Sequence, residues 1–177
     1  MKNLRAPAVP LVTVDPYFNI WSISECLTDD APRHWTGRRN PMTGMLKIDG
    51  VWKRFMGKVV SDNLDYFREP DAMEQTGVEI SPLITKYTFT ADEVVLTLRF
   101  FTPLLLDDLK LMSRPISYVD YEIASNDGKN HNVEFYFDIS SEAAVEDASA
   151  QSVRFALSEN GGSCGRGEQD MRARSGD

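Results

Sequence analysis

The sequence predicts an all-β protein, an antiparallel β-sandwich that stays incomplete at its C-terminus. Short runs rich in β-branched and aromatic residues recur along the chain, and clusters of Gly, Pro, Asn and Asp separate them. No long stretch between these runs shows the 3.6-residue period of an amphipathic helix. Several short strands without intervening helices are typical of packed antiparallel sheets.

The first two predicted strands lie at Pro7–Val14 and Tyr17–Ile23. Prolines in the first run favour an edge position, because proline has no N–H to donate to a neighbouring strand. Alternation in the second run is imperfect. Asp15-Pro16 lies between the two runs, and the residue before a proline is restricted to extended or turn geometry, so we predict a turn there.

The strongest local signal is Asp49-Gly50, which separates the runs Met45–Ile48 and Val51–Met56. Asp-Gly between two alternating runs predicts a two-stranded hairpin with a tight turn. Trp52 and Phe55 cannot both lie on one face of a regular strand. We therefore expect a twist or a bulge in the second strand of this hairpin.

The polar segment Ser61–Thr76 is predicted to be a loop with a short helical turn at Asp71–Glu74, and Pro70 excludes one continuous helix. The segment Leu104–Met112 is ambiguous, since its composition favours a helix but the run is short. Turn residues bound the remaining predicted strands. These strands are Leu83–Thr90, Val94–Thr102, Ile116–Ser125, Asn132–Ser140 and, more weakly, Val153–Leu157.

Three segments organise the chain: an N-terminal segment at 1–60, a sandwich region at 61–158 and an irregular tail at 159–177. The tail is dense in Gly and Arg and shows neither strand nor helix period. It is either a mobile terminus or a continuation that has been truncated or altered. A sandwich that stops here leaves unpaired strand edges, which favours the second alternative.

Composition excludes several classes of function. The net charge of −8 argues against non-specific nucleic-acid binding, which needs clustered Lys and Arg. Two cysteines and two histidines lie scattered at positions 26, 34, 131 and 164, so no metal-ligand spacing exists and we expect no metal or cofactor. No apolar run is long enough to span a membrane, and no hydrophobic stretch of signal-peptide type follows the basic first residues. The compartment stays open: cytoplasmic as written, or exported if a leader was removed.

One loop gathers the candidate site residues, which are Asp29, Asp30, Arg33, His34 and Trp35. Polar clusters with aromatic neighbours on a loop are places where a ligand or another module binds. The structural interpretation is simpler: Arg33 pairs with Asp29 or Asp30, and Trp35 fills the core with its N–H satisfied. Both interpretations stay open, with the structural one favoured because such clusters often have no function.

Three strings within Pro7–Gly57 stand in one order: PAVPLVTVDPYFNIWS, LTDDAPRHWTG and MTGMLKIDGVWKRFMG. They resemble the N-terminal region of the glutaminase A-like family. The resemblance implies a β-sandwich that precedes a helical toroidal catalytic module, which this chain lacks. It also implies that the intact protein hydrolyses L-glutamine to L-glutamate and ammonia, and that the missing helical module or a partner chain contacts this one.

Amide hydrolysis needs a nucleophile or activated water, an acid/base group and stabilisation of the oxyanion. His34 beside two acids is a candidate proton-transfer group. Cys26 is more simply an inert buried thiol, and His131 a surface residue at a strand end. The sequence offers single parts and no complete set, so we assign no catalytic residue and leave open whether this chain is an enzyme.

Two hypotheses follow. In the first, the chain is the non-catalytic N-terminal sandwich of a glutaminase-like hydrolase, inactive alone, whose loop at 29–35 faces the helical module. In the second, it is an independent binding module that recognises carbohydrate through Trp21, Trp35 and Trp52. The second hypothesis requires at least one of these three indoles to be exposed.

Overall fold

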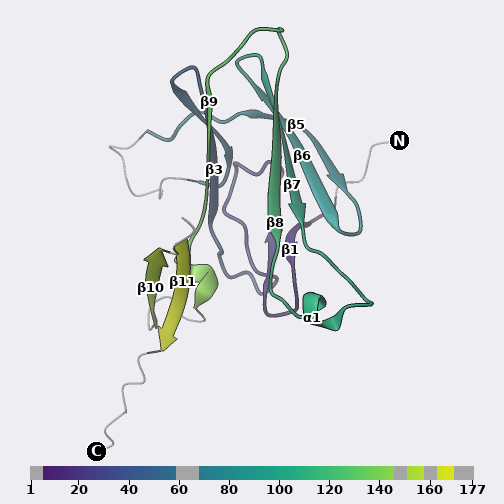
Figure 1. Cartoon of the computed structure of the whole chain (residues 1–177). Coiled ribbons are helices and arrows are strands. Elements are labelled where there is room, and N and C mark those ends of the chain that lie inside the picture. Colours follow the sequence, from purple (N-terminus) through teal and green to yellow (C-terminus); the bar gives the residue numbers. More distant parts are fainter. Residues whose placement is uncertain (1–5, 59–67, 146–150, 158–162, 170–177) are drawn as a thin grey trace, which may run out of the picture. The chain divides into compact units, whose positions relative to one another are not determined.

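The computed structural model describes residues 6–58, 68–145, 151–157 and 163–169 (Figure 1). The chain divides into two compact units, Met1–Asp138 and Ile139–Asp177. Among the described residues the only helical segments are α1 (Leu109–Met112) and the 3-10 helix η1 (Ser141–Ala144). The all-β prediction is therefore confirmed, and the consecutive strands that pair with each other run antiparallel.

The described residues of unit 1 form three sheets. A short hairpin pairs β1 (Val9–Thr13) with β2 (Asn19–Ser22). A three-stranded sheet has the order β4-β3-β9, and a four-stranded sheet has the order β5-β6-β7-β8. The bounds of these strands are β3 Met42–Ile48, β4 Val51–Met56, β5 Glu74–Ile80, β6 Ile84–Ala91, β7 Val94–Phe101, β8 Tyr118–Ser125 and β9 Val133–Ile139.

The hairpin predicted around Asp49-Gly50 is present between β3 and β4. Both turn residues have positive φ, 48° at Asp49 and 92° at Gly50, as a type I′ turn requires. The expected bulge is also present, because Gly44 pairs with Met56 while Met45 pairs with Arg54. Phe55 is thus the extra residue on β4, and its fully buried ring occupies the space beside Gly44.

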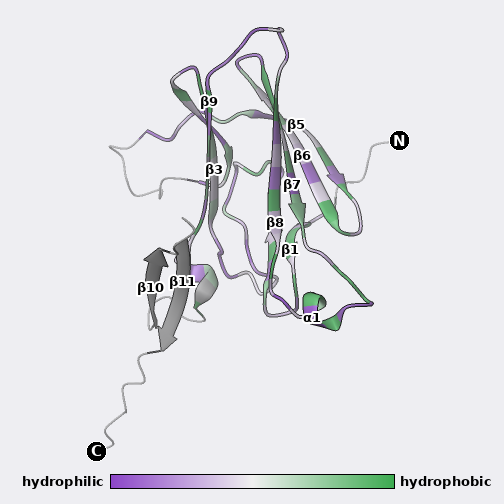
Figure 2. Cartoon of the chain, viewed as in Figure 1, coloured by the Kyte–Doolittle hydropathy of each residue, from purple (hydrophilic) through white to green (hydrophobic). Residues whose placement is uncertain are grey.

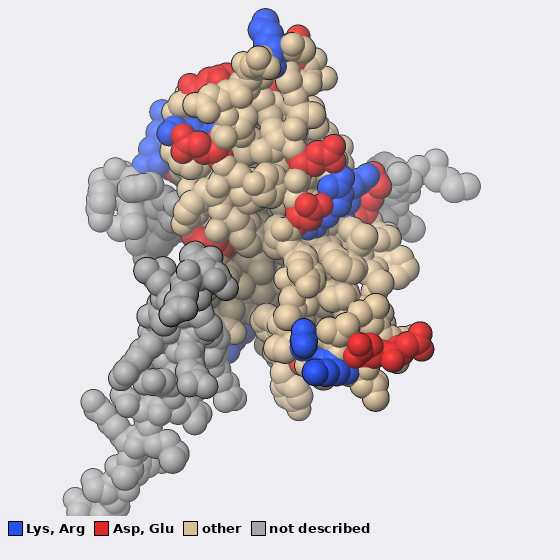
Figure 3. Space-filling view, in the orientation of Figure 1, with Lys and Arg blue, Asp and Glu red and all other residues tan. Residues whose placement is uncertain are grey.

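The four-stranded sheet has one apolar and one polar face. On β6 and β7 every second side chain is buried, as a half-buried strand requires. Charged side chains cross the opposite face: Lys86 pairs with Glu79 at 2.8 Å, and Arg99 reaches Asp120 at 3.1 Å and Glu122 at 2.9 Å. In Figure 3 acidic and basic side chains are interspersed on the face in view, with no wide area of one sign.

One hydrophobic core joins the three sheets of unit 1. The ring centroid of Phe55 on β4 lies 5.9 Å from that of Phe89 on β6, so the three-stranded and four-stranded sheets pack face to face through aromatic side chains. Within the three-stranded sheet, Phe55 also stacks on Phe135 of β9, with the ring centroids 5.4 Å apart. Tyr121 on β8 stacks on Phe135 at 3.8 Å but keeps 47% of its surface exposed. The core is therefore incompletely covered where β8 and β9 meet.

Two local predictions are wrong. The helical turn at Asp71–Glu74 is absent, because Ala72 forms a parallel bridge with Arg54 and β5 begins at Glu74. In unit 2, β10 (Gln151–Leu157) pairs antiparallel with β11 (Ser163–Gln169), which lies inside the segment predicted to be irregular. Backbone pairing with a neighbour, which local composition does not reveal, forms both missed strands. The other residues of the predicted tail, 159–162 and 170–177, lie outside the described residues.

Candidate functional site

Hydrogen bonds to residues on or next to β4 and β5 hold the segment that leads into the candidate loop. Leu27 is fully buried; its N–H donates to the side-chain oxygen of Gln75 at 2.9 Å, and its carbonyl accepts the N–H of Gly57 at 2.8 Å. The guanidinium of Arg54 donates to the carbonyl of Thr28 at 2.6 Å. Because these three bonds come from distant strands, they position the loop relative to the core.

The acidic half of the loop has a structural role. Asp29 accepts the N–H of Cys26 at 2.9 Å and closes a turn. Asp30 pairs with Arg33 at 2.8 Å and accepts the N–H of Ala31 at 2.8 Å. Although partial burial of Asp30 opposes ionisation, the hydrogen bonds from Arg33 and Ala31 hold the pKa of this carboxyl below its ordinary value. The predicted pairing of Arg33 with an acid is confirmed.

The basic half of the loop pairs with β2 through a backbone bridge at the edge of the two-stranded hairpin. Arg33 exchanges backbone hydrogen bonds with Trp21 at 2.7 and 2.8 Å and also pairs with Arg39. The buried side chain of Asn19 connects this segment to the β1–β2 turn. Its amide nitrogen donates to the carbonyls of Asp15 and Pro16, at 3.1 and 2.9 Å.

His34 does not contact the acids of its own loop. Its Nδ1 lies 2.8 Å from the hydroxyl of Thr36, and its Nε2 lies 3.1 Å from the carbonyl of Pro16 and 3.2 Å from the amide nitrogen of Asn19. A proton-transfer imidazole is ordinarily oriented by a carboxylate, and these three partners are neutral. The geometry therefore gives His34 a positioning role within the loop.

Trp35 is exposed over 67% of its surface, so the prediction that it fills the core is wrong. Its indole N–H still finds an acceptor, the carbonyl of Pro16 at 2.8 Å. Tyr17 follows Pro16 directly and is exposed over 93% of its surface. The loop and the β1–β2 turn thus each expose one aromatic side chain, and the hydrogen bond to Pro16 holds Trp35 at this turn.

A second loop with exposed apolar side chains lies at the same end of unit 1 as the β1–β2 turn (Figure 1). It was not predicted as a site from the sequence. It connects β7 to β8 and contains α1, none of whose residues is buried. Its large aliphatic side chains keep 40 to 73% of their surface exposed. They are Leu104, Leu105, Leu106, Leu109, Leu111 and Ile116. Figure 2 shows hydrophobic residues on α1. The run of three leucines was the available signal, but a leucine run is more often buried.

Hydrogen bonds connect the base of this loop, hereafter the leucine loop, to the end of β1. The N–H of Thr13, at the end of β1, donates to the hydroxyl of Thr102 at 3.2 Å. That hydroxyl lies 2.8 Å from the hydroxyl of Ser117, which closes the leucine loop. In Figure 1 the β1–β2 turn and α1 lie at the same end of unit 1. Two loops far apart in sequence therefore expose apolar side chains at one end.

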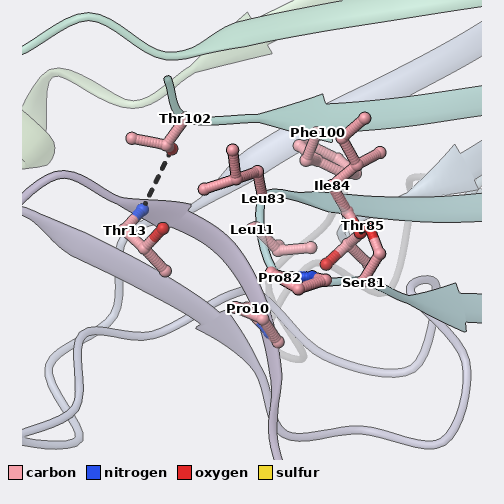
Figure 4. Close-up of a pocket in the computed structure, with 10 residues that line it drawn as sticks. All are labelled: Pro10, Leu11, Thr13, Ser81, Pro82, Leu83, Ile84, Thr85, Phe100 and Thr102. Atoms are coloured by element: carbon pink, nitrogen blue, oxygen red, sulfur yellow. Dashed lines mark hydrogen bonds between the residues drawn. The ribbon is translucent and has the colours of Figure 1, made fainter. Parts of the chain in front are cut away.

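The structure also contains a small groove of about 40 Å³ between β1 and the β5–β6 hairpin (Figure 4). Apolar side chains such as Leu11, Leu83 and Phe100 form most of its wall. Its polar groups already have partners, since Ser81 donates to the carbonyl of Ile84 at 2.9 Å and Thr102 accepts from Thr13. The groove offers no convergent set of unpaired polar groups of the kind that orients a substrate.

Within the described residues, no group of His, Cys, Asp and Glu side chains is placed to hold a metal ion. None of the helices in the described ranges is long and apolar enough to cross a membrane.

Comparison with known proteins gives a partial relationship. Residues 1–65 match one domain of unknown function, DUF4964, and residues 84–163 match a second, DUF5127. The chain is 29% identical over 154 residues to Glutaminase A of Aspergillus oryzae (strain ATCC 42149 / RIB 40), which covers 82% of this chain. No solved structure matches significantly. The chain spans 21% of that relative's length, so it is a partial homologue of Glutaminase A that resembles an N-terminal portion of it.

Proposed function

We propose that this chain is the N-terminal, non-catalytic β-sandwich portion of a glutaminase-like hydrolase, and that it is inactive alone. In the intact protein, L-glutamine would be hydrolysed to L-glutamate and ammonia. The partial homology to Glutaminase A supports this proposal. It is also supported by the site geometry, in which the acids have structural partners and His34 contacts none of them.

The proposal gives the loop at 29–35 a docking role: it faces the helical module of the intact protein. The exposed indole of Trp35, held by its hydrogen bond to Pro16, is the observation that carries this role. A tryptophan with one fixed orientation loses little conformational entropy on binding, and Trp and Arg are enriched at interface centres. Arg33 and Asp30 contribute a paired, charged rim beside it.

The leucine loop enlarges the same surface. A cluster of exposed leucines is unusual on a monomeric soluble protein and marks an interaction site. Asp107, Asp108, Lys110 and Arg114 within the loop sum to no net charge, which does not favour a strongly charged partner. An apolar centre with a mixed charged rim fits a protein partner, here the rest of the same hydrolase.

In the test, this chain is co-expressed with the part of Aspergillus oryzae Glutaminase A that lies outside the match, and their association is measured. Trp35→Ala and Arg33→Ala are compared with Trp52→Ala, a control at a second exposed tryptophan. We expect Trp35→Ala and Arg33→Ala to reduce association while thermal unfolding of the sandwich stays unchanged. Normal association together with a much lower unfolding temperature would make the loop structural and overturn the docking role.

A second candidate function keeps support from Trp35. Sugar rings stack on exposed aromatic faces, and the carbohydrate hypothesis required at least one exposed tryptophan. Trp35 meets that requirement and has Tyr17 nearby. Affinity electrophoresis of the purified chain in gels that contain soluble polysaccharides distinguishes the two functions. Retardation that Trp35→Ala abolishes would favour the binding module, and unchanged mobility in every gel would remove it.

A further inference from the structure

His131 lies between two carboxylates that belong to different connections of unit 1. Its Nδ1 is 2.7 Å from Oδ2 of Asp49, in the turn between β3 and β4. Its Nε2 is 3.2 Å from Oδ1 of Asp127, in the loop between β8 and β9. Contrary to the expected surface position, the side chain of His131 keeps only 14% of its surface exposed.

This geometry fits one protonation state of the ring. An ionised carboxylate only accepts hydrogen bonds, and a neutral imidazole carries a single N–H. Neutral His131 can therefore bind Asp49 or Asp127, but not both. Only the imidazolium form, with an N–H on each nitrogen, makes both contacts at once.

Both carboxylates are held in place by other groups. Asp49 accepts the N–H of Asn132 at 2.9 Å and donates its own N–H to the carbonyl of Asn132 at 2.9 Å. Asp127 accepts the hydroxyl of Ser125 at 2.9 Å and pairs with the ammonium of Lys129 at 2.8 Å. The acceptors are thus preorganised, and the proton on the ring decides whether the bridge forms.

We propose that His131, which lies in the β8–β9 loop, is a pH-dependent latch: the charged ring holds Asp49 of the β3–β4 turn and Asp127 at the same time, and the neutral ring gives up one of these two carboxylates. Asp49 belongs to the hairpin of the three-stranded sheet, and Asp127 follows β8 of the four-stranded sheet. The latch therefore joins the two sheets at the end of the edge where Tyr121 stacks on Phe135. Since the core is incompletely covered along this edge, the latch controls how firmly it stays closed.

The charged groups around the ring set the direction of the pH dependence. Asp49 and Asp127 face it directly, Lys129 pairs with Asp127, and β3 and β9 contribute the neighbouring pair Lys47–Glu134. The hydrogen bond to Asp49 and, as the second largest cause, the hydrogen bond to Asp127 raise the pKa of His131 above its ordinary value of 6.5. A raised pKa in the folded state means that this stabilisation is complete below 6.5 and is lost as the pH rises through the raised pKa.

The two acids act at the other end of the pH range. The hydrogen bond from His131, followed by that from Asn132, lowers the pKa of Asp49 below 3.8. Lys129 is the first cause of the lowered pKa of Asp127. Lowered pKa values mean that their contribution is complete above 3.8 and is lost only as the pH falls further. The stabilisation by the latch is therefore complete between pH 3.8 and pH 6.5, and the latch opens on the alkaline side.

The test is an NMR titration of the 177-residue chain, which has only two histidines, so His34→Gln assigns both ring signals. We expect the His131 ring to titrate with a midpoint above 6.5, and the midpoint to fall in Asp49→Asn and in Asp127→Asn. The wild-type titration alone is decisive if a variant fails to fold. A midpoint at or below 6.5 would overturn the latch.

Thermal unfolding gives a second readout that does not depend on the ring signals. We expect the unfolding temperature of the wild type and of His34→Gln to fall between about pH 6 and about pH 9, and that of His131→Gln to fall less, since its side chain does not titrate. Hydrogen exchange at the Asn132 amide, corrected for the intrinsic effect of pH, should accelerate over the same interval in the wild type only. Equal pH slopes for the wild type and His131→Gln would refute the latch.

Discussion

The side-chain oxygen of Asn19 accepts the indole N–H of Trp21 at 2.8 Å, and the same oxygen lies 3.3 Å from the N–H of Trp35. Asn19 is almost fully buried, and its amide nitrogen donates to the carbonyls of the β1–β2 turn. One short side chain thus connects the loop at 29–35 to the β1–β2 turn.

We predict that Asn19→Ala destabilises the protein by about 2–4 kcal/mol, because it leaves several partly buried donors and acceptors unpaired at about 1–3 kcal/mol each. Chemical denaturation measures the change, with the exposed Asn126→Ala as the control. The tryptophan fluorescence emission should also broaden, because Trp35 loses its fixed position. A change of Asn19→Ala no larger than that of the control would contradict the role assigned to this amide.

Arg54 and Arg99 both form ion pairs from strands of unit 1, and we predict that only the removal of Arg54 lowers the stability strongly. The guanidinium of Arg54 is buried and binds the carbonyls of Thr28 and Gly57 and the carboxylate of Glu69. Burial lowers its pKa, although Glu69 opposes this. Arg54→Ala should cost about 3–5 kcal/mol, the range for breaking a buried pair.

Arg99→Ala is the matched control for Arg54→Ala, since Arg99 pairs with Asp120 and Glu122 on the solvent side of the sheet. Solvent screens this pair, so we expect little change in stability. Denaturant midpoints of the two variants provide the comparison. Similar losses at both positions would show that burial is not what distinguishes these arginines.

Gly44 faces the ring of Phe55 across the bulge, and a Cβ added there would lie 2.1 Å from a ring carbon. We predict that Gly44→Ala destabilises by about 1–3 kcal/mol, the usual cost of overpacking a core. Gly77→Ala is the control, because the nearest atom to its new Cβ would be 4.0 Å away. A thermal melt in which both variants behave alike would exclude the close packing of Phe55 on Gly44.

The purified chain should release no ammonia from L-glutamine above the buffer blank. The described loop places no carboxylate on His34, so the imidazole beside the Thr36 hydroxyl lacks the acid that would orient it for proton transfer. A coupled glutamate dehydrogenase assay measures the release, with an authentic glutaminase as the positive control. Turnover by the wild type that His34→Ala abolishes would make the loop catalytic and overturn the proposed role of this chain.

Local patterns in the sequence determined most of the strands in unit 1. Alternation predicted β8 and β9, and β-branched and aromatic composition predicted β6 and β7. Asp49-Gly50 predicted the β3–β4 hairpin, and the positions of Trp52 and Phe55 predicted its bulge. These features depend on neighbours along the chain, since a turn needs particular φ values and a half-buried strand needs period-two alternation. The same reasoning failed for β5, which carries polar residues and Gly77 and is held by pairing with β6.

Only the tertiary structure decided what the candidate residues do. The sequence placed Asp30, Arg33, His34 and Trp35 in one loop, but their partners include Asn19 and the carbonyl of Pro16, which lie on the preceding hairpin. Likewise His131 meets Asp49 across 82 positions of the chain. A hydrogen bond between distant residues leaves no local pattern, because it forms only after the strands have packed. Exposure of Trp35 and of the leucine loop follows from the same packing, since an apolar residue type by itself predicts burial.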